Sequence, residues 1–393
     1  MSAVQPKNIL IFGGVHPLGK NIALAALQRG TYPRIRVIDT QSPDTAFLQE
    51  WERRAFRQIE VMQMNLGYQE DTDEALSKAF HLPDNQRWDI VVCAYCDFRL
   101  HGKRSEHVDF FVRRAWQISM ASQAYQAGVL IYIMQMGVVK WHSKMPPLKE
   151  DVSPMAWSGS QRSVAAVEAE KTVRSIKDLP LVVLRTAQVY GDGVLGPVEY
   201  AMMSVQANCD EDARIYYDIY DPDMKNNTVH TEDVARAVLH AGDWYLDHGL
   251  QGTRIFNIVD QGNFGYSDYF SIICDILQMN VHRVPRFTRW FTFFAMRFQW
   301  VSRRVLKEGS QRWIGFLHSH GITSTPLEYA ADHELFATPW GIALDGSAFC
   351  QETGFSYHFP IMNEATIRDN FRYFKDLGAW PDEDNDALPV TER

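Results

Sequence analysis

Three glycines follow the first apolar segment of the sequence. Residues 8–12 (NILIF) run directly into Gly13 and Gly14, and Gly19 follows where a helix is expected to begin. Glycines in such a loop make a tight turn, let the backbone approach a pyrophosphate and let the helix pack on the strand. The loop is therefore predicted to bind a dinucleotide, with its phosphates at the first turn of the helix.

One position of this loop departs from the pattern. His16 stands where a middle glycine is expected, so its side chain must swing aside or lie beside the phosphates. Pro17 suits the first turn of a helix because its φ is already close to the helical value, and Leu18 completes the stretch. The alternative is a Rossmann-like sheet that has lost its cofactor.

An acidic residue ends the next apolar segment. Asp39 follows Gly19 at the distance, about 20 residues, that is typical of a carboxylate on the adenosine ribose. Such a carboxylate accepts hydrogen bonds from the ribose hydroxyls and repels a 2′-phosphate, which favours NAD over NADP. Arg34 and Arg36 keep NADP open.

The elements that must position this loop alternate between apolar runs and helical patterns. Such alternation predicts a parallel sheet with helices on both faces, which is a doubly wound α/β fold of the Rossmann type. Strands are expected at 8–13, 34–39, 59–65, 88–95, 129–135 and 179–186, and helices at 18–30, 71–80, 110–128 and 163–178.

The alternation weakens in the second half of the chain. We expect residues 1–193, completed by 228–259, to form the dinucleotide-binding domain. Residues 194–227 and 260–380 are expected to form a smaller, mostly helical substrate domain. The acidic tail 381–393 is expected to be disordered.

Composition and charge restrict the class of protein and its partners. A chain of 393 residues with 46% hydrophobic and 22% charged residues is typical of a soluble globular protein. The net charge of −9 gives nucleic acid no general electrostatic attraction. No apolar run is long enough for a membrane span or a secretory leader, so a cytoplasmic protein is expected. No His, Cys or acidic cluster has the spacing of a metal site.

Further motifs occur in a fixed order along the chain: MNL (64–66), LRTAQVYGDG (184–193), VHTEDVARA (229–237) and PWGIALDGSAFCQETGFSYHFPI (339–361). With the glycine loop, they resemble the extended short-chain dehydrogenase/reductase family, in its nucleotide-sugar epimerase and 3β-hydroxysteroid dehydrogenase branches. The resemblance covers roughly residues 8–375. It implies a Rossmann fold, bound NAD and a contact of Asn65 and Leu66 with adenine.

The resemblance also implies a catalytic Ser, Tyr and Lys, which the matching positions do not supply. Counting back from the Ala-Glu pair at 169–170 puts Arg162 at the tyrosine position and Ala166 at the lysine position. Gln135 stands nearest the serine position. Alanine carries no charge, and arginine is a poor proton donor because its pKa exceeds about 12.

Three functions follow from this departure. The first is an enzyme with NAD bound that catalyses an isomerisation, cyclisation, dehydration or unusual redox step, with Gln135 and Arg162 polarising a substrate carbonyl and Tyr190 beside them. The second is a dinucleotide-binding pseudoenzyme or regulatory partner. The third is a reductase or epimerase with a relocated proton donor. The candidate donors are Tyr95, Tyr190, Lys140 and His142.

The segment 283–317 is dense in aromatic residues and arginines. Its pattern predicts a lid over an apolar substrate, an amphipathic helix at a membrane surface or a dimer face, and a helix packed on the second domain is the alternative. We expect a bulky, largely apolar small-molecule substrate, by analogy one of secondary metabolism. A peripheral contact with membrane or lipid through 283–317 and a homodimer are the other partner predictions. The aromatic residues at helical spacing are Phe287, Trp290, Phe291, Phe294 and Phe298.

Overall fold

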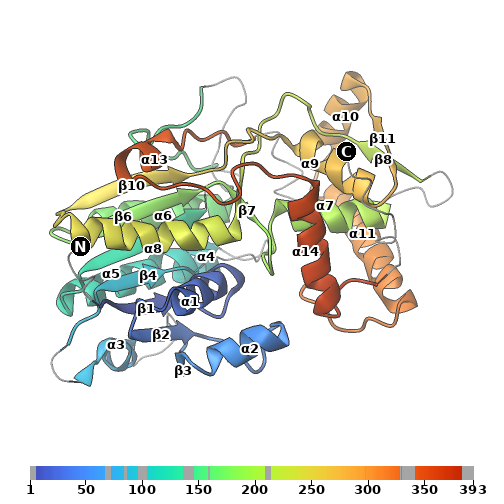
Figure 1. Ribbon diagram of the computed structural model, residues 1–393. Coiled ribbons are helices and arrows are strands. Elements are labelled where there is room, and N and C mark those ends of the chain that lie inside the picture. Colours follow the sequence, from blue (N-terminus) through green and yellow to red (C-terminus); the bar gives the residue numbers. More distant parts are fainter. Residues whose placement is uncertain are drawn as a thin grey trace.

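A single sheet of seven parallel strands forms the centre of the computed structural model, in the order β10-β6-β5-β4-β1-β2-β3 (Figure 1). The structure describes residues 6–66, 72–83, 86–95, 104–135, 146–157, 160–208, 214–296, 298–327, 329 and 341–382. The strands are β1 (Asn8–Phe12), β2 (Arg34–Asp39), β3 (Glu60–Gln63), β4 (Ile90–Cys93), β5 (Val129–Gln135), β6 (Leu181–Thr186) and β10 (Thr253–Ile258).

Helices cover both faces of this sheet. Two of them, α1 (Pro17–Arg29) and α8 (Thr231–Asp247), lie side by side over one face, and α2 (Glu50–Phe56) adjoins α1. The other face is covered by α3 (Thr72–Phe80), α4 (Arg104–His107), the π-helical turn η2 (Val108–Arg113), α5 (Arg114–Ala124) and α6 (Gln161–Arg174). The predicted doubly wound Rossmann fold is thereby confirmed.

The strands are apolar over their whole length because both faces of the sheet are covered. All residues of β4 and β6 are buried, as are all but the last of β5. The strand order reverses between β1 and β4, so the chain leaves these neighbouring strands in opposite directions. In folds of this kind a crevice opens there, at the carboxyl ends of the strands.

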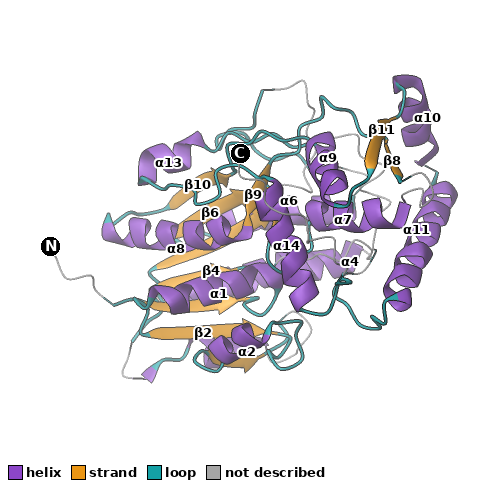
Figure 2. Ribbon diagram, turned by 45° about the vertical axis from the view of Figure 1, so that its right-hand side comes forward, coloured by secondary structure: helices purple, strands orange, loops and turns teal. Residues whose placement is uncertain are grey.

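A second hydrophobic core lies beside the sheet domain. It is enclosed by α7 (Pro197–Asn208), α9 (Tyr266–Ile276), α11 (Gln299–Ser319) and α14 (Glu364–Asp376). Two short parallel pairs accompany it, β8 (Ile215–Asp218) with β11 (Asn280–Arg283), and β7 (Gln188–Tyr190) with β9 (Thr228–His230). Figure 2 shows α10 (Arg286–Met296) and α11 at the outer end of this part.

One segment departs from the predicted domain boundaries. Ile342, Leu344 and Phe349 belong to the core of the sheet domain, although the sequence pattern assigns 260–380 to the second domain. Helix α13 (Ser347–Thr353) packs against β10 because Phe349 meets the ring of Phe256 at 5.2 Å. Residues 383–393 of the predicted tail lie outside the described residues.

A buried ion pair joins the two cores beside the glycine loop. The ammonium Nζ of Lys20 on α1 lies 2.5 Å from the carboxylate Oε1 of Glu52 on α2. It also donates to the hydroxyl of Tyr373 on α14, at 2.8 Å. Burial lowers the pKa of Lys20, and the Glu52 carboxylate opposes that change. The C-terminal helix is thus fixed against the first helix of the sheet domain.

Candidate active site

The glycine loop has the backbone shape that a dinucleotide site requires. Gly13 has a φ of +80°, in the left-handed region that other residues rarely adopt. A Cβ atom added to Gly19 would lie 2.0 Å from the carbonyl oxygen of Gly13, so only glycine lets α1 approach the turn this closely. At Gly14 an added Cβ would lie 2.8 Å from a methyl group of Val37.

The first turn of α1 is open to an anion. His16 is the N-cap residue, and its side chain makes no capping hydrogen bond. Pro17 occupies the first turn, which contains no acidic residue. The amide groups of Leu18 and Gly19, which side-chain caps commonly satisfy, are therefore not used by His16. The helix dipole and these amides together suit a pyrophosphate.

Asp39, predicted to hold the adenosine ribose, is engaged with the loop itself. Its side chain is fully buried, and Oδ2 accepts the amides of Val15 at 2.8 Å and His16 at 3.1 Å. The imidazole Nδ1 of His16 lies 2.8 Å from the same oxygen. Burial alone would raise the pKa of Asp39, but these bonds hold it below its ordinary value. A ribose would reach Oδ2 only after the His16 side chain moved.

The two arginines that left NADP as an alternative cofactor, Arg34 and Arg36, do not reach the side chain of Asp39. The Nη1 of Arg36 donates to the carbonyls of Ala79 and His81, each at 2.8 Å, and its Nη2 lies 2.9 Å from Glu60. Arg34 begins β2, at the opposite end of the strand from Asp39. Neither is placed to bind a 2′-phosphate beside Asp39.

Asn65 and Leu66, which are predicted to contact adenine, accept hydrogen bonds from an arginine that the sequence analysis did not identify. The Nε of Arg114 donates to the carbonyl of Leu66 at 2.7 Å, and its Nη2 donates to Oδ1 of Asn65 at 3.3 Å. Asn65 is exposed and Leu66 is buried. The same guanidinium lies over the rings of Tyr95 and Phe110, 4.9 and 4.4 Å from their centroids. Nothing in the local sequence pattern distinguishes Arg114 from an ordinary helical arginine.

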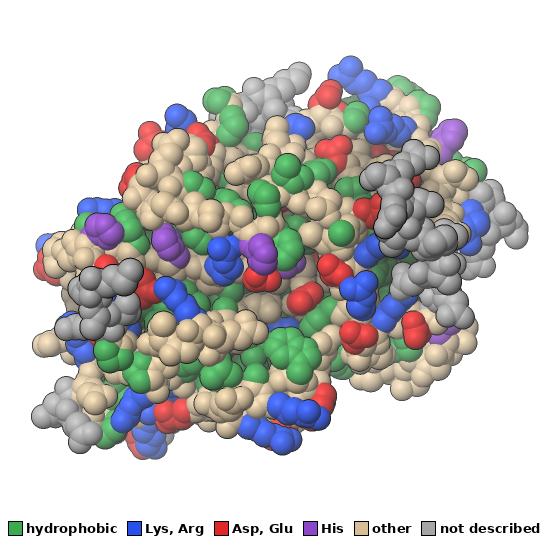
Figure 3. All heavy atoms as spheres, in the orientation of Figure 1, with side chains coloured by type: hydrophobic (Ala, Val, Ile, Leu, Met, Phe, Trp, Pro, Cys, Tyr) green, Lys and Arg blue, Asp and Glu red, His purple; other side chains and the backbone are tan. Residues whose placement is uncertain are grey.

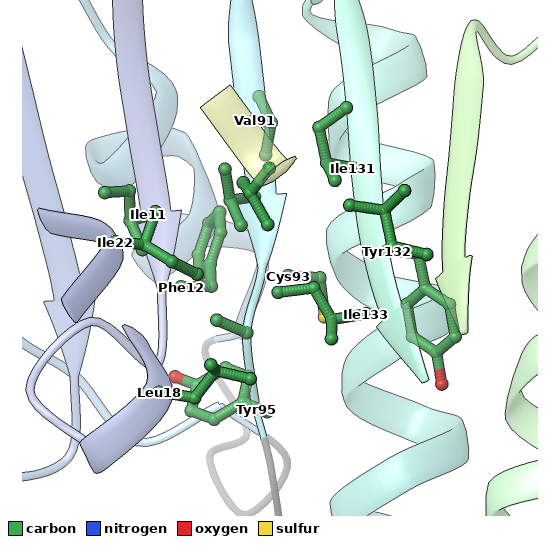
Figure 4. Packing of buried hydrophobic residues seen from close by; sticks show 14 of the residues in the cluster. Ile11, Phe12, Leu18, Ile22, Val91, Cys93, Tyr95, Ile131, Tyr132 and Ile133 are labelled. Carbon is green, nitrogen blue, oxygen red and sulfur yellow. The ribbon is translucent and has the colours of Figure 1, made fainter. Parts of the chain in front are cut away.

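A small cavity lies at the carboxyl ends of β4 and β5. Its volume is about 10 Å³, which is room for about one water molecule. Figure 4 shows Tyr95 beside Leu18, next to the first turn of α1, and the hydroxyl of Tyr132 at the end of β5. The cavity is lined by Tyr95, Phe111, Tyr132, Ile133, Met134, Gln135, Arg162 and Ala166. The structure thus brings Gln135, Arg162 and Ala166 together.

Two polar atoms of this wall are buried and have no hydrogen-bond partner in the part of the chain that the structure describes. They are Nε of Arg162 and the hydroxyl of Tyr95. Buried polar groups are nearly always satisfied, so atoms of this kind mark a place for water or a ligand. Burial, with a smaller contribution from Asp39, raises the pKa of Tyr95 far above its ordinary value, and the phenol stays protonated.

Of the other candidate donors, Tyr190 does not join this group. Tyr190 does not line the cavity: it is fully buried in the second core, with its ring 5.1 Å from that of His230. Lys140 and His142 lie outside the described residues. Glu199, which the sequence analysis did not single out, is buried beside the turn that follows Tyr190. Its carboxylate accepts hydrogen bonds from the amides of Gly191 and Gly196.

Comparison with known proteins supports the fold. No protein-family model and no curated protein matches the sequence. WbmG from Bordetella bronchiseptica, solved with NAD and UDP, is 16% identical with a TM-score of 0.62, over 95% of this chain and 96% of that one. UDP-glucose 4-epimerase from Thermotoga maritima, solved with UDP-glucose, is 16% identical with a TM-score of 0.61, over 94% and 98%. Both are similar to this chain in fold along nearly its whole length.

Proposed function

We propose that this chain is an enzyme of the epimerase/dehydratase type that binds NAD over the glycine loop and acts on a bulky, largely apolar small molecule. One observation carries the proposal: the buried Nε of Arg162 lacks a partner among the described residues, in a cavity that Gln135 shares. A guanidinium group with a free donor favours binding of an oxygen atom that carries negative charge.

Two observations support NAD as the cofactor. The turn at Gly13 and the close approach at Gly19 fit a dinucleotide, and the first turn of α1 is open to its phosphates. Solved structures of similar fold, WbmG among them, contain NAD. A bound nicotinamide would supply a hydride acceptor or donor. Asp39 disfavours NADP, and neither Arg34 nor Arg36 is placed beside it to bind a 2′-phosphate.

The chemistry that we propose is non-redox and electrostatic. Arg162 is permanently charged, so it stabilises an oxyanion that develops on a substrate carbonyl without giving up a proton. The Gln135 amide supplies a second donor, a neutral one, in the same wall. The cavity has room for about one water molecule, which matches a single carbonyl oxygen. Phe111, Ile133, Met134 and Ala166 make much of the remaining wall apolar, and such a site suits isomerisation, cyclisation or dehydration.

A reductase with a relocated donor is the second candidate, because Tyr95, whose hydroxyl has no partner among the described residues, lines the same cavity. The environment of the Tyr95 phenol argues against a reductase. Burial raises the pKa of Tyr95, whereas a tyrosine that shuttles protons near neutral pH needs its pKa lowered. Ala166, at the position where the family resemblance implies a lysine, supplies no charge for that purpose.

The test follows NADH absorbance with purified protein and a panel of apolar ketones. The wild type is expected to leave NADH unchanged. The double variant Arg162→Tyr/Ala166→Lys is expected to oxidise it, because a lysine one turn after a tyrosine lowers the phenol pKa. Arg162→Gln, which removes the charge and adds no phenol, is the matched control and is expected to stay inactive.

Two outcomes contradict this proposal. Steady oxidation of NADH by the wild type would establish the reductase. NADH binding without turnover of any ligand, together with an inactive double variant, would favour the regulatory partner.

A further inference from the structure

Helix α10 and the start of α11 expose a continuous aromatic face. We use this name for Phe287, Trp290, Phe291, Phe294, Phe298 and Trp300. Their exposed fractions run from 44% for Phe294 to 78% for Phe287. The first four recur at the spacing of one face of α10, and Phe298, the residue before α11, adjoins them through its contact with Phe294. Large apolar groups gathered in this way mark an interaction site.

Three rings of this face pack on one another. Trp290 stacks on Phe294 with ring centroids 5.7 Å apart, and Phe294 meets Phe298 edge-on at 5.5 Å. The opposite side of α10 anchors it: Met296 is buried, and Arg289 donates to the carbonyl of Tyr220 at 3.0 Å. The helix is therefore held on its inner side, and the aromatic face is directed outward.

The charge around this face is opposite to that of the whole protein. Residues 283–317 contain eight Lys and Arg residues and one acidic residue, Glu308, although the chain carries a net charge of −9. Arg283 ends β11, and Arg286 begins α10, where the helix dipole disfavours cations; the first turn of α10 has no acidic residue. Figure 3 shows Lys and Arg side chains together with hydrophobic ones at the upper right of the molecule, where Figure 1 places α10.

We propose that the aromatic face docks on the surface of an anionic lipid bilayer. Aromatic side chains inserted at the level of the headgroups, with arginines around them, are the chemistry of an interfacial helix. No helix within the described ranges is long and apolar enough to cross a membrane, so the contact is peripheral. The acidic remainder of the protein is repelled by such a surface, which orients this end toward it.

A second copy of the chain is the competing occupant. In a two-fold dimer the same patch would face itself, and the arginines around one aromatic face would oppose those around the other. Repulsion between like charges disfavours that arrangement, whereas anionic headgroups neutralise it.

Co-sedimentation with vesicles tests the proposal on the full chain. Vesicles of phosphatidylcholine mixed with phosphatidylserine are expected to bind the protein, more weakly at high salt, and phosphatidylcholine alone should bind far less. The variant Phe287→Ser/Trp290→Ser/Phe291→Ser is expected to lose at least about tenfold in affinity. Its control is Trp51→Ser/Trp116→Ser, which removes two indoles, each 48% exposed, at other places and should bind like the wild type.

A charge variant and a fluorescence measurement make the test independent of any one substitution. Arg303→Gln/Arg304→Gln, on exposed α11 positions, is expected to weaken binding about tenfold, and Arg54→Gln on α2 should not. Lipids with brominated chains should quench tryptophan emission of the wild type more than that of Trp290→Phe. Absence of wild-type binding to the mixed vesicles would overturn the proposal. A wild-type dimer that sedimentation shows to become a monomer in the aromatic variant would overturn it in favour of the second copy.

Discussion

The imidazole Nδ1 of His16 lies 2.8 Å from the carboxylate Oδ2 of Asp39. This contact explains how a histidine is accommodated where dinucleotide loops usually have glycine. The His16 side chain points toward Asp39 and bonds to it, and so lies away from the position of the phosphates. It also occupies the oxygen that a ribose would use. The pair therefore connects the unusual residue of the loop with the affinity of the site for NAD.

Replacing His16 by glycine is expected to tighten NADH binding about fivefold. A hydrogen bond from ribose to the freed carboxylate is worth about 2 kcal/mol, and the added flexibility of glycine offsets about 1 kcal/mol of it. Calorimetric titration with NADH measures the change. His320→Gly, at an exposed position after α11, is the control. Weaker binding by the His16 variant would mean that the imidazole itself holds the ligand.

Asp39→Asn is expected to lower the free energy of unfolding by about 2 kcal/mol at neutral pH, because an amide replaces a charged acceptor of buried donors. The pKa of Asp39 is held below its ordinary value in the folded state, so its contribution is present above pH about 4 and is lost as pH falls further. Urea denaturation of wild type and variant at neutral and acidic pH checks both statements. Asp44→Asn, at an exposed position, should match the wild type throughout.

Glu199 gives the protein a pH-dependent stability of the opposite sign. Burial raises its pKa to about 7, although hydrogen bonds from Asn370 and from the amides of Gly191 and Gly196 oppose the change. At this site the folded state then binds more protons than the unfolded state, so the contribution of Glu199 to stability is greatest in acid and falls by about 3 kcal/mol as pH rises from 4 toward 7.

The measurement compares unfolding of wild type and Glu199→Gln at pH values on both sides of this window. The variant is expected to lose less stability toward alkaline pH than the wild type. Glu168→Gln, at an exposed position of α6, keeps the wild-type slope. Equal slopes for wild type and Glu199→Gln would show that the pKa of Glu199 is not raised in the folded protein.

The pair of Lys20 and Glu52 should respond in a non-additive way. Lys20→Met leaves a buried carboxylate without its partner and is expected to cost about 4 kcal/mol. The double variant Lys20→Met/Glu52→Leu removes both charges and is expected to recover most of that loss. A double-mutant cycle by urea denaturation measures the coupling. Additive effects would mean that the ammonium and the carboxylate do not hold α1, α2 and α14 together.

Much of the sheet could be predicted, because strands that are covered on both faces have continuous apolar sequences. The expected strand at 34–39 is β2 as observed, and that at 129–135 is β5. Helix α2 was not predicted because its seven residues are mostly charged and show no apolar stripe. The position of α13 against β10 was missed, because its contacts come from residues far away in the sequence.

The candidate site was predictable only where sequence order carries the information. Counting along the helix from the Ala-Glu pair placed Arg162 near Gln135, and both line one cavity. The contact of His16 with Asp39 and the hydrogen bond from Arg114 to Asn65 depend on side-chain positions that cannot be predicted from sequence spacing. Tyr190 follows the same motif as in the resembling family, yet it lies in the second core.

Titration of NADH against the wild type and Gly19→Ala tests the central claim most directly. We predict saturable binding by the wild type and its loss in the variant, since the new Cβ would lie 2.0 Å from the carbonyl oxygen of Gly13. Gly315→Ala, where an added Cβ meets nothing within 4 Å, should bind like the wild type. No binding by the wild type at millimolar NADH, or undiminished binding by Gly19→Ala, would contradict a dinucleotide site at this loop.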